Sequence, residues 1–332
     1  MIIGSLFNAL AGAAAHMADG MLTVLVFHRV TAVQDALFPE EMYAHRFDTL
    51  LGRLKRYWKI VPLGQAVDCL RAGTLRSPCM AITFDDGYAD NFLIAAPILR
   101  KHRVAATIFV ASGYLGGGCM WNDKVIEAVR STRHRRLQFS FLENRDLVAD
   151  TNEQRRAVID KVLGTIKHWN TERRAEACEE VARVCAVVPP NDLMMSPEQI
   201  QALPEMGIAI GAHTVTHPIL ASLGDDVAAW EIAQGKTDLE ILLGQTVDLF
   251  AYPNGKPLRD YLPKHVEMVK AAGFRAAFST SWGAGGSRSG IYDLPRFTPW
   301  DASITAFNFR LLRNLFVEQE CAASGYVGSR WE

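Results

Sequence analysis

The chain has 332 residues, of which 49% are hydrophobic, and its 35 basic and 36 acidic side chains give a formal net charge of −1. This length suffices for one large barrel-like domain or for two smaller domains. The near-zero charge gives no electrostatic reason to expect a nucleic-acid partner, and six cysteines without a Cys-x-x-Cys pair indicate neither a zinc knuckle nor a disulfide framework.

Residues 1–21 form an apolar segment before the first predicted strand. No Lys or Arg precedes Arg29, so the positively charged start of a secretory signal peptide is missing. The segment is also too short, and too interrupted by polar residues, to span a membrane. We expect a helix that packs on the body of the protein or associates weakly with a membrane surface. The cytoplasm is the favoured location, with peripheral membrane attachment or export as alternatives.

Strands and helices alternate along the rest of the chain. The patterns predict strands over 22–28, 57–61, 80–84, 105–111, 208–212, 247–252, 276–280 and 294–297, and helices over 41–57, 63–71, 91–101, 225–243, 259–272 and 304–317. The segment from about 127 to 203 shows mostly helical patterns and is interpreted as an insertion. This alternation implies parallel βαβ units and suits a (β/α) barrel over residues 22–320, followed by a C-terminal tail over 321–332.

Two adjacent carboxylates, Asp85 and Asp86, stand at the end of the predicted strand 80–84. Gly87 allows a sharp turn there, and neighbouring side chains on a strand point to opposite faces. One carboxylate can therefore bind a metal while the other stays free to move a proton. The alternative is an ordinary strand-to-helix turn in which Asp86 or Asp90 caps the following helix.

Two histidines four positions apart, His213 and His217, follow the predicted strand 208–212. Imidazole is a common ligand of zinc and related divalent ions, and catalytic zinc sites usually combine three protein ligands with one water. Asp86 with the two histidines makes such a set. Thr214 is expected to fix the loop by bonding its own backbone, and Pro218 prevents a helix from forming through the pair.

The residues Thr83-Phe84-Asp85-Asp86-Gly87, together with His213-Thr214-x-x-His217, resemble the polysaccharide deacetylase family, also called the NodB-homology or carbohydrate esterase family 4 domain. Further matches are Phe250-Ala251-Tyr252-Pro253-Asn254-Gly255, which suggests a Phe-Ala-Tyr-Pro subgroup, and Leu294-Pro295-Arg296. The resemblance extends over approximately residues 28–297, and the two main motifs in this order are specific. It implies an irregular α/β barrel of about seven parallel strands, a deformed TIM barrel, with the helical insertion on it.

The resemblance also implies a mechanism. Asp86, His213 and His217 are the implied metal ligands, and Asp85 is the implied general base. A divalent metal polarises the acetamide carbonyl and lowers the pKa of a bound water to about 7. Zinc is the expected ion, with cobalt, nickel and manganese as alternatives. The implied substrate is an N-acetylated sugar of a polysaccharide, such as an exopolysaccharide, or of a glycolipid-linked glycan.

Two positions depart from the family pattern. The third family motif often contains an arginine that orients the base, but Ala251 stands there, so Arg296 is the expected replacement; an ordinary ion pair at the barrel rim is the alternative. The late histidine that protonates the leaving group is also missing. His28, at the end of the first strand, is the expected proton donor, with a buried structural histidine as the alternative. His265 lies in a predicted helix and is expected at the surface.

Six residues in loops after strands are predicted to bind the sugar: Trp121, Asn122, Asp123, Tyr252, Pro253 and Asn254. An aromatic face such as that of Trp121 stacks well on a sugar ring, although an ordinary core position explains this tryptophan equally well. The backbone amide of Asn254 is expected to help stabilise the oxyanion.

The motifs leave three other functions open. An O-acetyl esterase or a small-amide hydrolase is possible on the same scaffold, and an inactive barrel could simply bind glycan. The missing arginine and late histidine favour such a binding protein. The intact set of Asp85, Asp86, His213 and His217 argues against it, because binding alone does not need these residues. The sequence does not indicate an oligomeric state.

Overall fold

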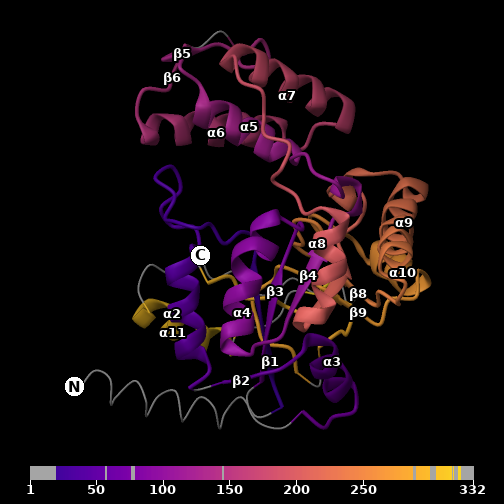
Figure 1. Cartoon of the computed structure of the whole chain (residues 1–332). Coiled ribbons are helices and arrows are strands. Elements are labelled where there is room, and N and C mark those ends of the chain that lie inside the picture. The colour runs from indigo at the N-terminus through magenta and orange to yellow at the C-terminus, as the bar shows by residue number, and fades with distance from the viewer. Residues whose placement is uncertain are drawn as a thin grey trace, which may run out of the picture.

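The computed structural model describes residues 20–56, 58–75, 79–143, 146–286, 289–299, 304–315, 317 and 321–322. Within them, a curled and parallel sheet is surrounded by helices, and a further group of helices stands beyond one end of it (Figure 1). The predicted N-terminal helix lies outside the described residues, as does all but the first two residues of the predicted tail. In the described part of the chain, every helix is too short or too polar to cross a membrane.

The main sheet has the strand order β1-β3-β4-β7-β8-β9, and the short β2 pairs with the start of β3. All of these pairings are parallel. The strands are β1 (Leu22–Phe27), β2 (Lys59–Ile60), β3 (Cys79–Phe84), β4 (Ala106–Val110), β7 (Ile208–Ala212), β8 (Leu249–Ala251) and β9 (Ala276–Phe278). β1, β3 and β4 are buried at every position, as expected for apolar strands covered on both faces.

The predicted strand 294–297 is instead a connecting segment that links the two edges of the sheet. Leu294 forms a parallel bridge to Phe278 in β9, and Phe297 forms one to Leu25 in β1. Pro295 between them has no N–H to donate, which disfavours a continuous ladder. The curled sheet and this segment together form the deformed (β/α) barrel that the sequence predicts.

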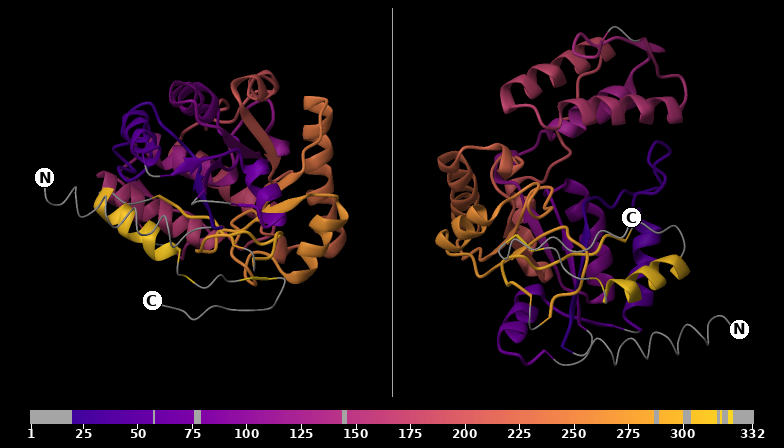
Figure 2. Two further views of the ribbon diagram at one scale, coloured as in Figure 1. Left: turned by 90° about the horizontal axis from the view of Figure 1, so that it is seen from below. Right: turned by 180° about the vertical axis from the view of Figure 1, so that it is seen from behind.

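Helices pack around the outside of the barrel (Figure 2). They are α2 (Ala44–Leu54), α3 (Leu63–Arg71), α4 (Ala96–His102), α8 (Pro197–Ala202), α9 (Asp225–Leu243), α10 (Pro263–Ala271) and α11 (Ile304–Asn314). α2 buries Phe47, Leu50, Leu51 and Leu54, the residues of its predicted apolar face. The predicted helix over 91–101 is divided, because a π-helical turn (Asn91–Ala95) precedes α4.

The inserted segment forms a helical unit that we call the cap. It consists of α5 (Trp121–Ser131), β5 (Arg136–Leu137), β6 (Leu147–Val148), α6 (Asn152–Ile166) and α7 (Thr171–Cys185). Its helices enclose their own apolar cluster, and β5 and β6 form an antiparallel pair that the helical patterns do not predict. The cap stands over the end of the barrel at which the strands finish (Figure 1).

His265, expected at the surface, is fully buried in the first turn of α10. Its Nδ1 accepts a hydrogen bond of 3.0 Å from the backbone N–H of Leu262. This bond requires an unprotonated Nδ1. Burial lowers the pKa of His265 to about 4, and the neighbouring charge of Lys264 adds to the effect. The imidazole therefore acts as a helix cap rather than as a solvent-exposed group.

We expect His265 to make the folded protein less stable in acid. Its folded pKa lies below the value of about 6.5 in an unfolded chain, so the unfolded state binds the proton first and stability falls as the pH drops from about 6.5 to 4. Glutamine at this position can accept the same bond but does not titrate. Urea denaturation measures the free energy of unfolding at each pH. When the pH is lowered from 7 to 4.5, this free energy should fall by about 2 kcal/mol more in wild type than in His265→Gln. Equal losses would contradict this role.

Candidate active site

The predicted catalytic residues meet at the end of the barrel that faces the cap. Asp85 and Asp86 directly follow β3, and His213 directly follows β7. His28 directly follows β1. Residues at the carboxyl ends of parallel barrel strands share one face of the molecule, which is where barrel enzymes place their active sites.

Asp86, His213 and His217 form a compact group of possible metal ligands. One ligand atom of each lies within 4.8 Å of the others. Asp86 Oδ1 is 3.5 Å from Nε2 of His213 and 3.3 Å from Nε2 of His217. This oxygen is buried and has no hydrogen-bond partner among the described residues. A divalent cation would satisfy the orphaned oxygen together with both imidazoles, so the three residues fit a zinc-type site.

The two imidazoles present their Nε2 atoms to this group. Nδ1 of His213 is 2.7 Å from the backbone oxygen of Ala251, and a proton on Nδ1 leaves the Nε2 lone pair facing the carboxylate. Burial lowers the pKa of His217 to about 4 against the opposing charge of Asp86, so this ring is neutral at pH 7. For His213, burial is outweighed by Asp85 and Asp86, which raise its pKa. A bound cation would repel that proton.

The backbone around the ligands is strained. Asp86, Thr214 and His217 have φ values of 75°, 66° and 55°, in the left-handed region that non-glycine residues seldom adopt. The hydroxyl of Thr214 accepts a hydrogen bond of 3.1 Å from the N–H of His217, which fixes the loop locally. Strain of this kind persists only where surrounding contacts hold the conformation, and it is concentrated at functional sites.

Glu231 in α9 supplies such contacts and was not among the predicted residues. The side chain is buried, and its Oε2 accepts hydrogen bonds from the backbone N–H groups of Val215 and Thr216, at 2.8 and 2.9 Å. Its Oε1 accepts a bond from the Thr216 hydroxyl. One feature of the sequence could have indicated this role: Glu231 is an acidic residue that stands between Ala228 and Ile232, both on the buried side of α9.

We expect Glu231→Gln to weaken zinc binding by about 10–100-fold, the range typical of groups that support a ligand. The glutamine amide replaces one acceptor oxygen with a donor, which then faces backbone or hydroxyl donors. Competition with a chromogenic chelator measures the zinc affinity. The control is Asp226→Asn, an exposed acidic position on the same helix. An unchanged zinc affinity in Glu231→Gln would show that the loop does not depend on this carboxylate.

Asp85 pairs with Arg296 from the segment that closes the barrel. Nη1 and Nη2 of Arg296 donate to Oδ1 and Oδ2 of Asp85 at 2.6 and 2.8 Å, and Nε donates to the backbone oxygen of Ser279 at 2.9 Å. Asp85 is 2% exposed and Arg296 is 0% exposed. Burial alone would raise the pKa of Asp85, but the charges of Arg296 and His213 outweigh it and hold the pKa below its usual value. Asp85 is therefore ionised at neutral pH.

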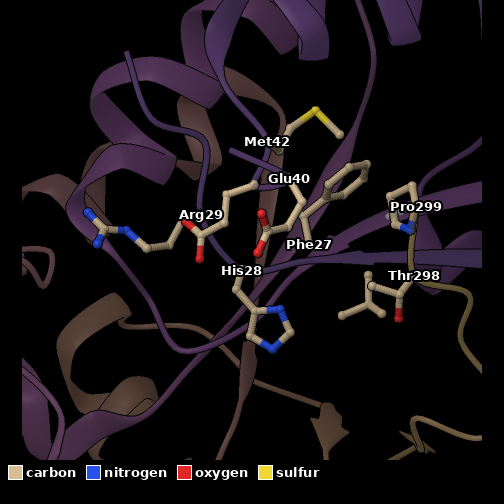
Figure 3. A pocket seen from close by; sticks show the side chains of 9 residues that line it. Phe27, His28, Arg29, Glu40, Met42, Thr298 and Pro299 are labelled. Atoms are coloured by element: carbon tan, nitrogen blue, oxygen red, sulfur yellow. The ribbon is translucent and has the colours of Figure 1, made fainter. Parts of the chain in front are cut away.

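His28 is exposed beside a pocket of about 170 Å³ at the barrel rim (Figure 3). The pocket is lined by Val26, Phe27, His28, Arg29, Glu40, Glu41, Met42, Thr298 and Pro299. Asn91 donates a hydrogen bond of 2.8 Å to the backbone oxygen of His28, which fixes the end of β1. Because His28 directly follows β1, it lies at the same end of the barrel as the metal-ligand group.

The residues predicted to bind sugar differ in how far they remain accessible. The ring of Tyr252 is fully buried against Tyr261, with 3.7 Å between the ring centres, so only its backbone can face the site. Trp121 is half-buried, and the guanidinium of Arg174 lies 4.8 Å from its ring centre. Asn122 and Asn254 are half-buried as well, whereas Pro253 is buried.

Asp123 is 3% exposed, and its carboxylate is engaged within the protein. It accepts a hydrogen bond of 3.1 Å from the Tyr88 hydroxyl and one of 3.3 Å from the N–H of Met120 at the start of α5. Burial, opposed by Arg29, raises the pKa of Asp123 to about 7. Tyr88 and Asp123 are 35 positions apart, and the residues around them do not indicate this pairing.

Comparisons with known proteins found a family model, a relative and solved structures that are similar to this chain. The family model described as polysaccharide deacetylase matches residues 72–277. YxkH of Bacillus subtilis (strain 168), provisionally named a polysaccharide deacetylase, is 21% identical over 275 residues, which cover 83% of this chain and 70% of that protein.

Among solved structures, the deacetylase PplD of Streptococcus pyogenes, in complex with acetate, has a TM-score of 0.58 at 17% identity, covering 90% of this chain and 99% of that one. The structure of IcaB from Ammonifex degensii has a TM-score of 0.56 at 20% identity, and the match covers 89% of this chain and 96% of that one. These structures share the fold of the chain.

Proposed function

The chain belongs to the polysaccharide deacetylase family, whose model matches more than half of its residues, and on this basis we propose that it is a metal-dependent hydrolase that removes N-acetyl groups from sugars. The substrate would be a polysaccharide or a glycolipid-linked glycan. The observation that carries the proposal is an ionised and buried Asp85, held by Arg296, beside three possible metal ligands. Zinc suits the two imidazoles and one carboxylate.

Asp86, His213 and His217 would hold a divalent ion, which when bound polarises the acetamide carbonyl and lowers the pKa of a water molecule. Asp85 then takes the proton of the attacking water. Because Arg296 keeps the pKa of Asp85 low, this carboxylate stays ionised at neutral pH. The low pKa also makes Asp85 a weak base, so it can accept a proton only from a water whose own pKa has been lowered. The paired guanidinium also fixes the carboxylate in one orientation.

Two other groups would complete the reaction. The backbone N–H of Asn254 forms no backbone hydrogen bond within the described residues, and φ of 58° at this residue sets it in a sharp turn after β8. We assign it to the negative oxygen that develops as the acetamide is attacked. His28, exposed after β1 at the same end of the barrel as the ligands, would donate the proton that the departing amine needs.

An amine-release assay on an N-acetylglucosamine oligomer, with zinc present, tests the proposal. Free amine and acetate should appear in equal amounts, and neither should appear with Asp85→Asn. Acetate from an O-acetylated glycan, with no amine from the oligomer, would instead identify an O-acetyl esterase. Absence of both products with zinc, cobalt, nickel and manganese would contradict a deacetylase and leave a glycan-binding barrel.

A further inference from the structure

The pocket at the end of β1 combines an apolar wall with two carboxylates, and we call it the β1 pocket. Phe27, Met42 and Pro299 form the apolar wall, and Glu40 and Glu41 line the same space of about 170 Å³ (Figure 3). Glu40 is exposed, whereas Glu41 is half-buried. Within the part of the chain that the structure describes, neither carboxylate takes part in a hydrogen bond or an ion pair. The β1 pocket therefore presents two negative groups that no side chain neutralises by direct contact.

The cations whose charges act on Glu41 are already paired with other carboxylates. Nε of Arg29, which also lines the β1 pocket, is 2.7 Å from Oδ2 of Asp90, and Nη2 of Arg130 is 2.7 Å from Oδ2 of Asp35. The guanidinium of Arg29 extends away from the apolar wall (Figure 3). Burial raises the pKa of Glu41 against the opposing charges of Arg29 and Arg130. A cation that enters the pocket would supply the counter-charge that this half-buried carboxylate lacks.

The β1 pocket adjoins the proposed catalytic residues but does not include the metal ligands. The backbone oxygen of Phe27 accepts a hydrogen bond of 2.9 Å from the N–H of Asp85. His28, the proposed proton donor, lines the pocket, as does Thr298, two positions after Arg296. None of the three metal ligands, all of which the structure describes, is among the lining residues. A sugar whose acetamide is at the metal would therefore leave the β1 pocket free for a neighbouring unit of the same glycan.

We propose that the β1 pocket binds the protonated amine of an amino sugar next to the sugar that is deacetylated. An ammonium group carries one positive charge and three N–H donors, and ionised carboxylates only accept, so the two glutamates match it. The apolar wall suits the C–H face of a sugar ring. The volume is below the roughly 300–1,000 Å³ of pockets for drug-sized ligands, which favours a single sugar unit.

A divalent cation suits the β1 pocket less well than an amine does. Among the described residues, three metal-ligating side chains come together only at Asp86, His213 and His217. The glutamates of the pocket therefore do not form part of a comparable ligand set. The inference rests on the proposed function and narrows its substrate to a glycan that already carries a free amine.

Calorimetric titration of the zinc-loaded protein tests the proposal without requiring turnover. The probes are a β-1,4-linked glucosamine tetramer and a glucose tetramer of the same linkage, which differ only in the group at carbon 2 and carry no acetyl group. At a pH at which the amines are protonated, we expect the glucosamine tetramer to bind at least about tenfold more tightly, with a preference that weakens as salt is added. This preference should fall about tenfold in the double variant Glu40→Gln/Glu41→Gln.

The matched control is Glu205→Gln, which changes an exposed glutamate of η3 (Pro204–Met206). This short helix precedes β7, at the end of the barrel opposite the active site, so the preference should be unchanged. Amines that contact zinc or Asp85 would contribute equally in all variants and cannot produce the difference. The single variants Glu40→Gln and Glu41→Gln should each lose part of the preference, which keeps the test valid if the double variant folds poorly.

Equal affinity for the two tetramers, or a preference retained in all three glutamine variants of the pocket, would overturn the proposal. So would a second bound metal ion that is lost in the double variant, because the pocket would then hold a metal. A protein that shows the amine preference but releases no amine from an N-acetylglucosamine oligomer would refute the proposed function and not this inference.

Discussion

Replacement of Asp85 by asparagine is expected to lower kcat for amine release by about 10³-fold or more, the range of a lost general base. The substitution keeps the size of the side chain but removes its charge and one of its two acceptor oxygens, so proton transfer from water fails. Asp86, His213 and His217 are unchanged, so zinc should remain bound. Steady-state kinetics and metal analysis of the same preparation measure both quantities. A variant with full zinc and more than a tenth of wild-type kcat would contradict the assignment of Asp85 as base.

Variants of Arg296 distinguish the role of Asp85 as a base from the contribution of the guanidinium that holds it. Arg296→Met leaves a buried Asp85 without its counter-charge, which should reduce the free energy of unfolding by about 3–5 kcal/mol. It should also raise the pKa of Asp85, so the acidic limb of the kcat profile should move to higher pH. Arg296→Lys retains the charge but not the paired hydrogen bonds. It should therefore reduce the free energy of unfolding less than Arg296→Met does, and it should move the acidic limb of the kcat profile less.

His213→Ala is expected to lose zinc and activity together. The variant leaves two of three protein ligands, and the zinc affinity should fall by more than the roughly 100-fold that loss of a supporting residue can cause. Amine release should be undetectable at zinc concentrations that saturate the wild type. His45→Ala is the control, because His45 is an exposed histidine on α2. Zinc bound at full occupancy in His213→Ala would place the metal elsewhere.

Much of the fold follows from local sequence. β3 and β7 are short apolar runs bounded by turns, and the residues with catalytic chemistry directly follow them. Once parallel strands are expected, their carboxyl ends must share one face, which brings Asp86 and His213 together without knowledge of any contact. Local sequence does not predict the structure of segment 294–297 correctly, because its bridges to β9 and β1 depend on where the edges of the sheet lie in space.

Contacts between distant residues are the part that sequence reasoning could not supply. The family resemblance leads us to expect that Arg296 orients Asp85, but the two residues are 211 positions apart and local sequence does not specify their two-bond pair. Glu231 supports the histidine loop from the buried side of α9, where an acidic residue alone does not reveal its partners. Tyr88 and Asp123 likewise meet only because the start of the cap packs beside the turn after β3.

The most direct test of a metal-dependent deacetylase is amine release from an N-acetylglucosamine oligomer before and after removal of bound metal. We predict that a chelator abolishes release and that stoichiometric zinc, or cobalt, restores it in wild type but not in His213→Ala. Amine release that continues at full rate in protein shown to be metal-free would contradict the central role assigned to Asp86, His213 and His217.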